Sequence, residues 1–265
     1  IGNLEDITLR ALNVLKNSDK ILCEDTRHSL KLLNHYNIKK KLVAYHKFNE
    51  KKLIPSVIKF ISNGEKISLI SDAGTPILSD PGLLLLKECI KEDIKIFPIP
   101  GVSAITTATS VSGFEEKYFF YGFLTKKEKE LEKVLKNLSN YNVSIVFFIP
   151  SLKINFYMKF FKKFFSDRKI VIAKEMTKLH ENFYRENLKS FKGFKKTIKG
   201  ELTVVLSKKE ERYNFKKNDF NKKKISIEIN DYLKRYSLKD VAKLVSEKYK
   251  LPKKQIYDLC LKIKK

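Results

Sequence analysis

One stretch indicates the fold most clearly: Leu69-Ile70-Ser71-Asp72-Ala73-Gly74-Thr75-Pro76-Ile77-Leu78-Ser79-Asp80-Pro81-Gly82. An apolar strand leads into this loop and a helix follows it, with Pro81 where its missing N–H costs nothing. Gly74 lets the backbone approach a ligand closely, and the prolines stiffen the loop. In α/β sheets, ligands bind at loops that leave the carboxyl ends of parallel strands. The stretch therefore predicts a ligand-binding loop in an α/β fold, with a sharp structural turn as the alternative.

The flanking segments alternate between strand and helix. Strict alternation implies a mostly parallel sheet with helices on its faces. A second strand–loop–helix segment spans 94–111, and its loop, Pro98-Ile99-Pro100-Gly101-Val102-Ser103-Ala104, is expected to converge with the first on one site. Apolar spacing and breakers predict helices over 4–15, 29–36, 53–61, 83–90 and 103–111, and strands over 20–23, 42–45, 66–70 and 94–97.

The rest of the chain predicts a second α/β domain and a helical tail. Strands are expected over 118–121, 144–148, 169–173 and 202–206, with helices over 127–138 and 152–165. We therefore expect α/β domains over 1–113 and 114–207, a basic linker over 208–224 and a helical module over 225–265. In that module, Ser237 is expected to cap a helix over 241–248, and a second helix spans 255–263. The module is either helix-turn-helix-like or a hairpin packed on the body.

Composition excludes several classes of protein. Apolar residues make up 43% of the chain and charged residues 32%, which is typical of a globular protein. The longest nearly unbroken apolar run, 143–149, is far shorter than the ~20 residues of a membrane span. No secretory signal is visible at the start. The three cysteines are widely spaced and match neither a disulfide framework nor a metal site, so we expect a cytoplasmic protein without a bound metal.

The charge is strongly positive and unevenly distributed. The formal net charge is +25, and it divides as +4 over 1–110, +10 over 111–207 and +11 over 208–265. A polyanion such as nucleic acid is the usual partner of a surface with this excess. Codon bias in an AT-rich genome also produces a Lys-rich chain, but such a bias acts on all parts alike, so the asymmetry favours a polyanion.

Six motifs of the chain point to one family: they are Ile1-Gly2-Asn3-Leu4-Glu5-Asp6-Ile7-Thr8-Leu9-Arg10-Ala11, Cys23-Glu24-Asp25-Thr26-Arg27-His28, Ser71-Asp72-Ala73-Gly74-Thr75-Pro76, Pro98-Ile99-Pro100-Gly101, Ala173-Lys174-Glu175-Met176-Thr177-Lys178 and Lys199-Gly200-Glu201. Together they resemble the family of ribosomal RNA small subunit methyltransferase I, in the tetrapyrrole methylase superfamily. The resemblance covers most of 1–207 and is weak over the tail.

The resemblance implies an S-adenosylmethionine-dependent enzyme that methylates the ribose 2′-oxygen of a decoding-site cytidine in 16S ribosomal RNA. It further implies a substrate presented in the 30S subunit and a homodimeric enzyme. The cofactor would lie folded in a cleft between the two α/β domains. The cofactor-binding residues implied by the matching motifs are Ile1, Gly74, Thr75, Pro76, Ile77, Leu78, Ser103, Ala104 and Ala173.

The sequence departs from the family pattern in three places. The strand and the Thr-Pro that usually precede Ile1 are absent, and we expect that the chain has been trimmed there. Lys174 stands where arginine is common. The segment 149–152 stands where the family tends to carry Glu-Ser-Pro-His-Arg, which removes charge near the cleft.

Polar clusters after the first two strands supply the catalytic candidates. A 2′-hydroxyl is weakly acidic, so a base that takes its proton assists the attack on the methyl group. Asp25 is the candidate base or orienting acid, and the forked donors of Arg27 suit a phosphate or ribose clamp. His46 and Glu175 are reserve candidates. The alternative to a catalytic role is a structural one, in which Asp25 caps a helix.

Two other functions remain open from the sequence. One is a methyltransferase of the same superfamily acting on a small tetrapyrrole, which the basic middle and tail disfavour. The other is a non-catalytic nucleic-acid-binding protein whose tail does the binding, which the two loop motifs disfavour.

Overall fold

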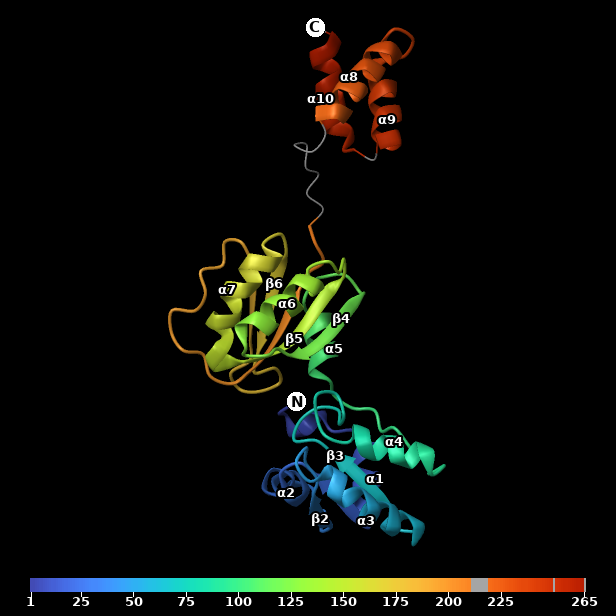
Figure 1. Ribbon diagram of the computed structural model, residues 1–265, viewed down its shortest axis with the longest axis vertical. Helices are drawn as coiled ribbons and strands as arrows, with labels where there is room; N and C mark the ends of the chain where they lie inside the picture. Colours follow the sequence, from blue (N-terminus) through green and yellow to red (C-terminus); the bar gives the residue numbers. More distant parts are fainter. Residues whose placement is uncertain (211–218, 250, 265) are drawn as a thin grey trace. The chain divides into compact units, whose positions relative to one another are not determined.

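The computed structural model describes residues 1–210, 219–249 and 251–264. The chain divides into two compact units, Ile1–Glu210 and Glu211–Lys265. The first unit contains two sheets, and the second contains helices only in its described residues (Figure 1). The domain boundaries expected from the sequence stay predictions.

The first sheet is parallel, in the order β2-β1-β3. Cys23 is level with Ala44 of β2 and with Ile70 of β3, so all three strands end at one edge. The expected parallel sheet is thus confirmed, and its strands fall within a residue or two of the expected positions. The strands are β1 (Lys20–Cys23), β2 (Lys41–Ala44) and β3 (Ile67–Ile70), and the helices of this part are α1 (Leu9–Asn17), α2 (Thr26–His35), α3 (Glu50–Ser62), α4 (Leu83–Lys91) and α5 (Ala104–Ser110).

Two expectations for this part are wrong. The strand expected over 94–97 does not form, and Phe97 is 76% exposed. Apolar alternation reports which side chains can be buried, but a strand also needs a neighbour to pair with, and this segment lies outside the described sheet. The single helix expected over 4–15 is instead a 3₁₀ turn, Leu4–Asp6, followed by α1, because the Thr8 hydroxyl accepts the Ala11 N–H (3.1 Å) and starts a new helix.

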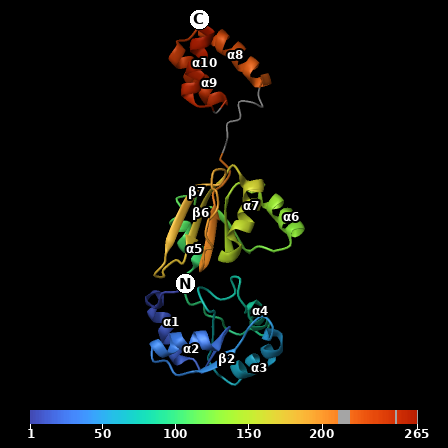
Figure 2. The same ribbon diagram turned by 90° about the vertical axis from the view of Figure 1, so that its left-hand side faces the viewer.

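The second sheet is mixed, in the order β4-β5-β8-β6-β7, with only the β4–β5 pair parallel. Helices α6 and α7 cover one face and α5 covers the other (Figure 2). Strand β7 was not expected, because its sequence Asn-Phe-Tyr-Arg-Glu-Asn does not alternate between apolar and polar residues. The elements are β4 (Tyr118–Phe123), α6 (Glu128–Leu138), β5 (Ser144–Pro150), a 3₁₀ turn (Ser151–Lys153), α7 (Ile154–Phe165), β6 (Lys169–Lys174), β7 (Asn182–Asn187) and β8 (Glu201–Leu206).

Helix α5 joins the two sheets of the first unit. It follows the loop at 98–103, and its buried side chains Ile105 and Ala108 pack among valines of the second sheet. The loop at 98–103 and α5 therefore connect the first sheet to the second.

A buried arginine connects the ends of β5, β6 and β8 at one edge of the second sheet. The Arg168 side chain is almost fully buried and donates to the carbonyl oxygens of Val143 (2.8 Å), Ser207 (2.9 Å) and Tyr141. Burial lowers the pKa of its guanidinium. All three carbonyls accept a bond from one guanidinium, and the bond to Ser207 is buried from solvent.

We expect Arg168→Leu to lower the free energy of unfolding by about 3 kcal/mol, because the leucine leaves those carbonyls unsatisfied. Urea denaturation measures the change, and the exposed Arg10→Leu is the control. Equal stability of the two variants would show that the network adds nothing.

The second unit is a three-helix bundle in its described part: α8 (Asp219–Leu233), α9 (Leu238–Tyr249) and α10 (Lys253–Lys264). It has its own core, which includes Ile229, Val241 and Cys260. The two expected tail helices are confirmed, and the Ser237 hydroxyl accepts the Asp240 N–H as expected (3.3 Å). Helix α8 begins inside the expected linker, and 211–218 lie outside the described residues. In the described part of the chain, every helix is too short or too polar to cross a bilayer.

Candidate functional site

Carboxylates gather at the carboxyl edge of the first sheet. Glu24 and Asp25 follow β1, and Asp72 follows β3. The Asp25 N–H donates to Asp72 Oδ1 (3.2 Å), which joins the two strand ends. Asp80, farther along the loop after β3, lies close enough to Glu24 and Asp72 to experience their charge. The parallel register brings these groups to one place from distant points of the chain.

The loop from 71 to 82 has a strained backbone. Ile77 and Ser79 both have a φ of 76°, and Gly74 has a φ of 74°. A residue with a side chain rarely adopts this left-handed conformation, which costs on the order of 1–3 kcal/mol and persists only where the surroundings impose it. Such conformations occur preferentially at ligand sites, which supports the ligand-binding interpretation of this loop.

The two expected loops do converge. The Thr75 hydroxyl donates to the Val102 carbonyl (3.2 Å), and the Thr8 hydroxyl donates to the Pro100 carbonyl (3.4 Å). Three segments, 1–8, 71–82 and 98–103, therefore meet. Ser103 occupies the N-cap position of α5, yet its side chain makes no cap hydrogen bond. Its hydroxyl is therefore not used by the helix.

Most of the cofactor candidates lie close together. Ile1, Ala104 and Ala173 belong to one apolar cluster between α5 and the second sheet. A Cβ on Gly74 would lie 3.7 Å from Ile1 Cγ2. Leu78 is 46% exposed, and Thr75, Pro76 and Ile77 complete the loop between it and Gly74. Their role in binding a cofactor stays a prediction.

Asp25 is the N-cap of α2 and the partner of Arg27. Its carboxylate accepts the Arg27 N–H (2.9 Å) and both Nε (3.1 Å) and a terminal nitrogen (2.7 Å) of the Arg27 side chain. These bonds hold the pKa of Asp25 well below its usual range. A carboxylate that resists protonation is a weak base, so the geometry favours an orienting role for Asp25. The Arg27 side chain is 88% exposed and points a cation at solvent beside the acidic edge.

The pKa of Asp80 is shifted in the opposite direction from that of Asp25. Burial first, and then the charges of Glu24 and Asp72, raise its pKa to about 6, against an opposing hydrogen bond with Ser71. A carboxylate with a pKa near neutrality is suited to accept a proton. In the sequence, Asp80 is one of several polar residues of its loop, and no local pattern distinguishes it, because the shift of its pKa depends on groups that are distant in sequence.

The two reserve candidates lie on different sheets. His46 follows β2 at the same edge, and its Nδ1 is buried without a hydrogen-bond partner among the described residues. Glu175 follows β6 and accepts hydrogen bonds from the Glu201 N–H (2.8 Å) and from Lys178 Nζ (3.1 Å), which lower its pKa. Glu175 thus fastens the end of β6 to the start of β8.

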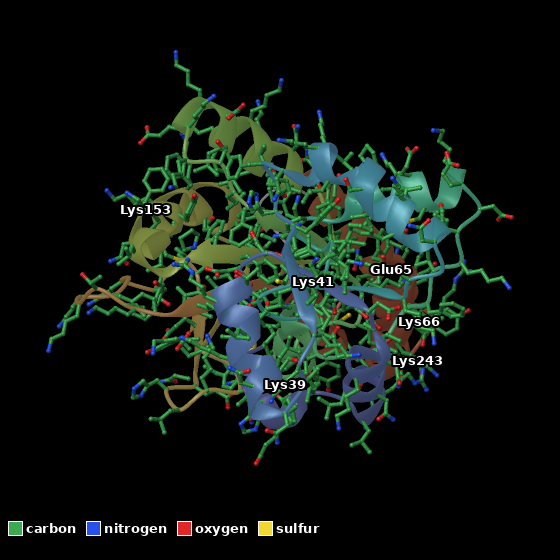
Figure 3. The ribbon with its side chains drawn as sticks, turned by 90° about the horizontal axis from the view of Figure 1, so that it is seen from below. Lys39, Lys41, Glu65, Lys66, Lys153 and Lys243 are labelled. Atoms are coloured by element: carbon green, nitrogen blue, oxygen red, sulfur yellow. The ribbon has the colours of Figure 1, made fainter. Side chains whose placement is uncertain are left out.

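The two edges of the first sheet differ in charge. The amino edge carries Lys20, Lys41 and Lys66 together with Asp19 and Glu65, and Figure 3 labels Glu65 next to Lys66. The carboxyl edge carries Glu24, Asp72 and Asp80. An acidic edge attracts a cation and repels phosphate.

Comparison with known proteins identifies the family. The model of the Tetrapyrrole (Corrin/Porphyrin) Methylases matches residues 1–192. A relative from Thermotoga maritima, named ribosomal RNA small subunit methyltransferase I, is 45% identical over 79% of this chain and 96% of its own length. The chain belongs to the ribosomal RNA small subunit methyltransferase I family, within the tetrapyrrole methylases. A further member, from Buchnera aphidicola, is 37% identical over 99% of the chain and 94% of its own length.

Solved structures share the tetrapyrrole methylase fold at low sequence identity. Diphthine synthase superimposes with a TM-score of 0.61 at 14% identity, covering 77% of this chain and 86% of its own. Cobalt precorrin-4 methyltransferase superimposes with a TM-score of 0.56 at 16% identity, covering 77% and 90%. The expected fold, two α/β parts followed by a helical tail, is thereby confirmed.

Proposed function

We propose that the chain is an S-adenosylmethionine-dependent methyltransferase that modifies the 2′-oxygen of a decoding-site cytidine in 16S ribosomal RNA. The observation that carries the proposal is the pairing of an acidic edge, which includes a carboxyl group with a pKa of about 6, with the strained loop after β3. The names of the family's curated members support ribosomal RNA as the substrate class.

The residues present fit a cationic cofactor. Glu24, Asp72 and Asp80 repel one another at this edge, and Asp80 has no cation of the described chain within 4.0 Å. S-adenosylmethionine carries a sulfonium, and when bound it supplies the methyl group as an electrophile. Ile1, Ala104 and Ala173 would provide apolar contact, while the loop at 74–78 and the hydroxyl of Ser103 would provide polar contact.

In the proposed mechanism, Asp80 accepts the proton of the ribose 2′-hydroxyl. Asp80 does this only when it is ionised, so kcat/KM should rise with pH through about 6 and then level off, since this parameter reports the free enzyme. Asp25 orients Arg27, and the exposed guanidinium binds a phosphate beside the target nucleotide. Positioning the hydroxyl in line with the methyl group supplies much of the remaining rate.

The partners follow from the same proposal. The substrate is the 30S subunit, and the enzyme acts as a cytoplasmic homodimer. Incubation with methyl-labelled S-adenosylmethionine and either 30S subunits, naked 16S RNA or uroporphyrinogen tests the function. Label in the RNA of either sample supports the proposal. Label in uroporphyrinogen alone supports the small-molecule alternative, and no label with any substrate supports the non-catalytic one.

Deleting residues 225–265 is expected to weaken RNA substrate binding far more than cofactor binding. The deleted part has its own core, so its removal leaves the first unit intact. The deleted residues contain eleven basic and five acidic side chains, a net +6 of the +11 carried by 208–265, and contacts between lysines and phosphates release counterions. The Michaelis constant for 30S subunits, measured against salt, should rise and lose part of its salt dependence. An unchanged constant and salt slope would mean that the tail is only structural.

A further inference from the structure

The first unit contains a pocket at the edge of its second sheet. Its volume is about 450 Å³, within the range of roughly 300–1,000 Å³ that small-molecule sites occupy. It is lined by the end of β6, by β7 and by the segment that precedes β8. The side chains that matter for its chemistry are Lys174, Tyr184, Phe194, Lys195, Lys196 and Lys199.

The pocket is on the opposite face of the second sheet from the cofactor candidates. Tyr184 and Phe194 pack against the cluster formed with α6 and α7, whereas Ala173 belongs to the cluster that contains α5. Side chains of successive strand residues point to opposite faces, so Lys174 points away from the side that Ala173 faces. The pocket and the apolar cofactor candidates thus lie on opposite faces of the second sheet, and Glu175 is the one catalytic candidate in the pocket lining.

The pocket carries an excess of positive charge. Four lysines line it, and within the described residues none of them lies within 4.0 Å of a carboxylate. Glu175 is the one acidic side chain of the lining, and its carboxylate is already bound by Lys178 and the Glu201 N–H. The lysines are therefore available to an anion from outside.

The aromatic wall of the pocket is rigid. Tyr184 and Phe194 stack edge to face, with ring centroids 4.9 Å apart. The Asn155 side chain donates to the Phe194 carbonyl (2.8 Å) and accepts the Phe194 N–H (2.9 Å), which fixes the segment that carries Phe194. Glu175 packs directly on Gly200, where a Cβ would lie 2.5 Å from the Glu175 side chain. A fixed aromatic surface beside several cations suits a nucleotide, whose base stacks while its phosphate binds lysine.

We propose that this pocket binds one nucleotide of single-stranded RNA, with its phosphate on Lys196 and Lys199 and its base against Tyr184. The inference rests on the proposed function, which requires an RNA strand on this chain. At the carboxyl edge of the first sheet, the carboxylates disfavour phosphates other than the one assigned to Arg27, so the rest of the strand needs cationic contacts elsewhere. Unpaired nucleotides expose their bases for stacking, which a duplex does not.

The test measures binding of a short fluorescent single-stranded RNA by anisotropy at several salt concentrations, without cofactor. The pocket variant is Lys196→Glu with Lys199→Glu. Its control is Lys133→Glu with Lys136→Glu on α6, two exposed lysines that receive the same change of charge. The pocket variant should lose about tenfold in affinity, and the slope of log K against log salt should fall in magnitude by about 0.7, the share of one single-strand phosphate. Equal losses in the two variants would overturn the proposal.

A second variant separates a nucleotide from a simple polyanion. Tyr184→Leu keeps an apolar side chain in place but removes the stacking surface. It should weaken RNA binding about tenfold and leave binding of inorganic polyphosphate unchanged. Equal weakening of both ligands, at an unchanged melting temperature, would overturn base stacking.

Failure of this proposal differs from failure of the proposed function. A chain that binds RNA through the pocket but transfers no methyl group contradicts the function alone. A pocket variant that binds RNA and methylates 30S subunits as the parent does contradicts the pocket alone.

Discussion

Asp80→Asn is expected to slow methyl transfer about 100- to 1,000-fold, because an amide cannot take the proton of the 2′-hydroxyl. The rising limb of kcat/KM near pH 6 should vanish along with the rate, since Asp80 is the group that produces it. Single-turnover kinetics at saturating cofactor, repeated across pH, measures both effects.

The same substitution should make the protein more stable. The pKa of Asp80 in the folded chain, about 6, is higher than its usual value of 3.8, so the folded state binds the extra proton between these values. Stability contributed by this group is therefore lost as pH rises through that window. Above it, Asp80→Asn should raise the free energy of unfolding by about 1 kcal/mol, after allowance for partial exposure. Below the window the two proteins should be equally stable.

Asp93→Asn is the matched control, because Asp93 is exposed and asparagine tolerates its left-handed backbone. It should change neither the rate nor the stability. If Asp80→Asn retained the parent rate at all pH values, Asp80 would be excluded as the base. A loss of both rate and stability would indicate a structural role instead.

Gly74→Val is expected to abolish cofactor binding while the protein stays folded. At a φ of 74°, a β-branched residue is strained, and a Cβ there already lies 3.7 Å from Ile1 and 3.9 Å from the Val102 carbonyl. The branches of valine extend farther and would displace both segments. Isothermal titration with S-adenosylhomocysteine measures the affinity.

Gly64→Val is the control that distinguishes the effect of backbone strain from the effect of a side chain in the proposed cofactor site. Gly64 has a similar φ of 86°, yet a Cβ there meets nothing within 4 Å. Both variants should lose comparable stability in thermal melts, and only Gly74→Val should lose the cofactor. Unchanged affinity in Gly74→Val would place the cofactor site elsewhere.

Local sequence patterns predicted the elements whose burial follows a simple period. Strand β1 spans the expected residues, Lys20 to Cys23, and the last three of them form its short apolar run. The expected strand at 94–97 failed because pairing depends on a neighbour that periodicity does not report. Strand β7 was missed for the converse reason: it pairs with β6 along its whole length although its residues do not alternate.

The location of the candidate site could be predicted from the sequence, but the chemical roles of its residues could not. The loop motifs located the convergence that the Thr75–Val102 hydrogen bond secures. Asp25 looked like a base from its position after β1, and only its bonds to Arg27 assign it an orienting role. The raised pKa of Asp80 arises from spatial neighbours, and the lysine pocket needs β7, so neither could be predicted from local pattern.

The most direct test is the chemical position of the transferred methyl group. 30S subunits labelled by the chain are digested to nucleosides, and a second sample of their RNA is hydrolysed with alkali. We expect the label in 2′-O-methylcytidine and in an alkali-resistant dinucleotide, because a methylated 2′-oxygen cannot attack the adjacent phosphate. Label on a base, or label released entirely as mononucleotides, would contradict 2′-O-methylation.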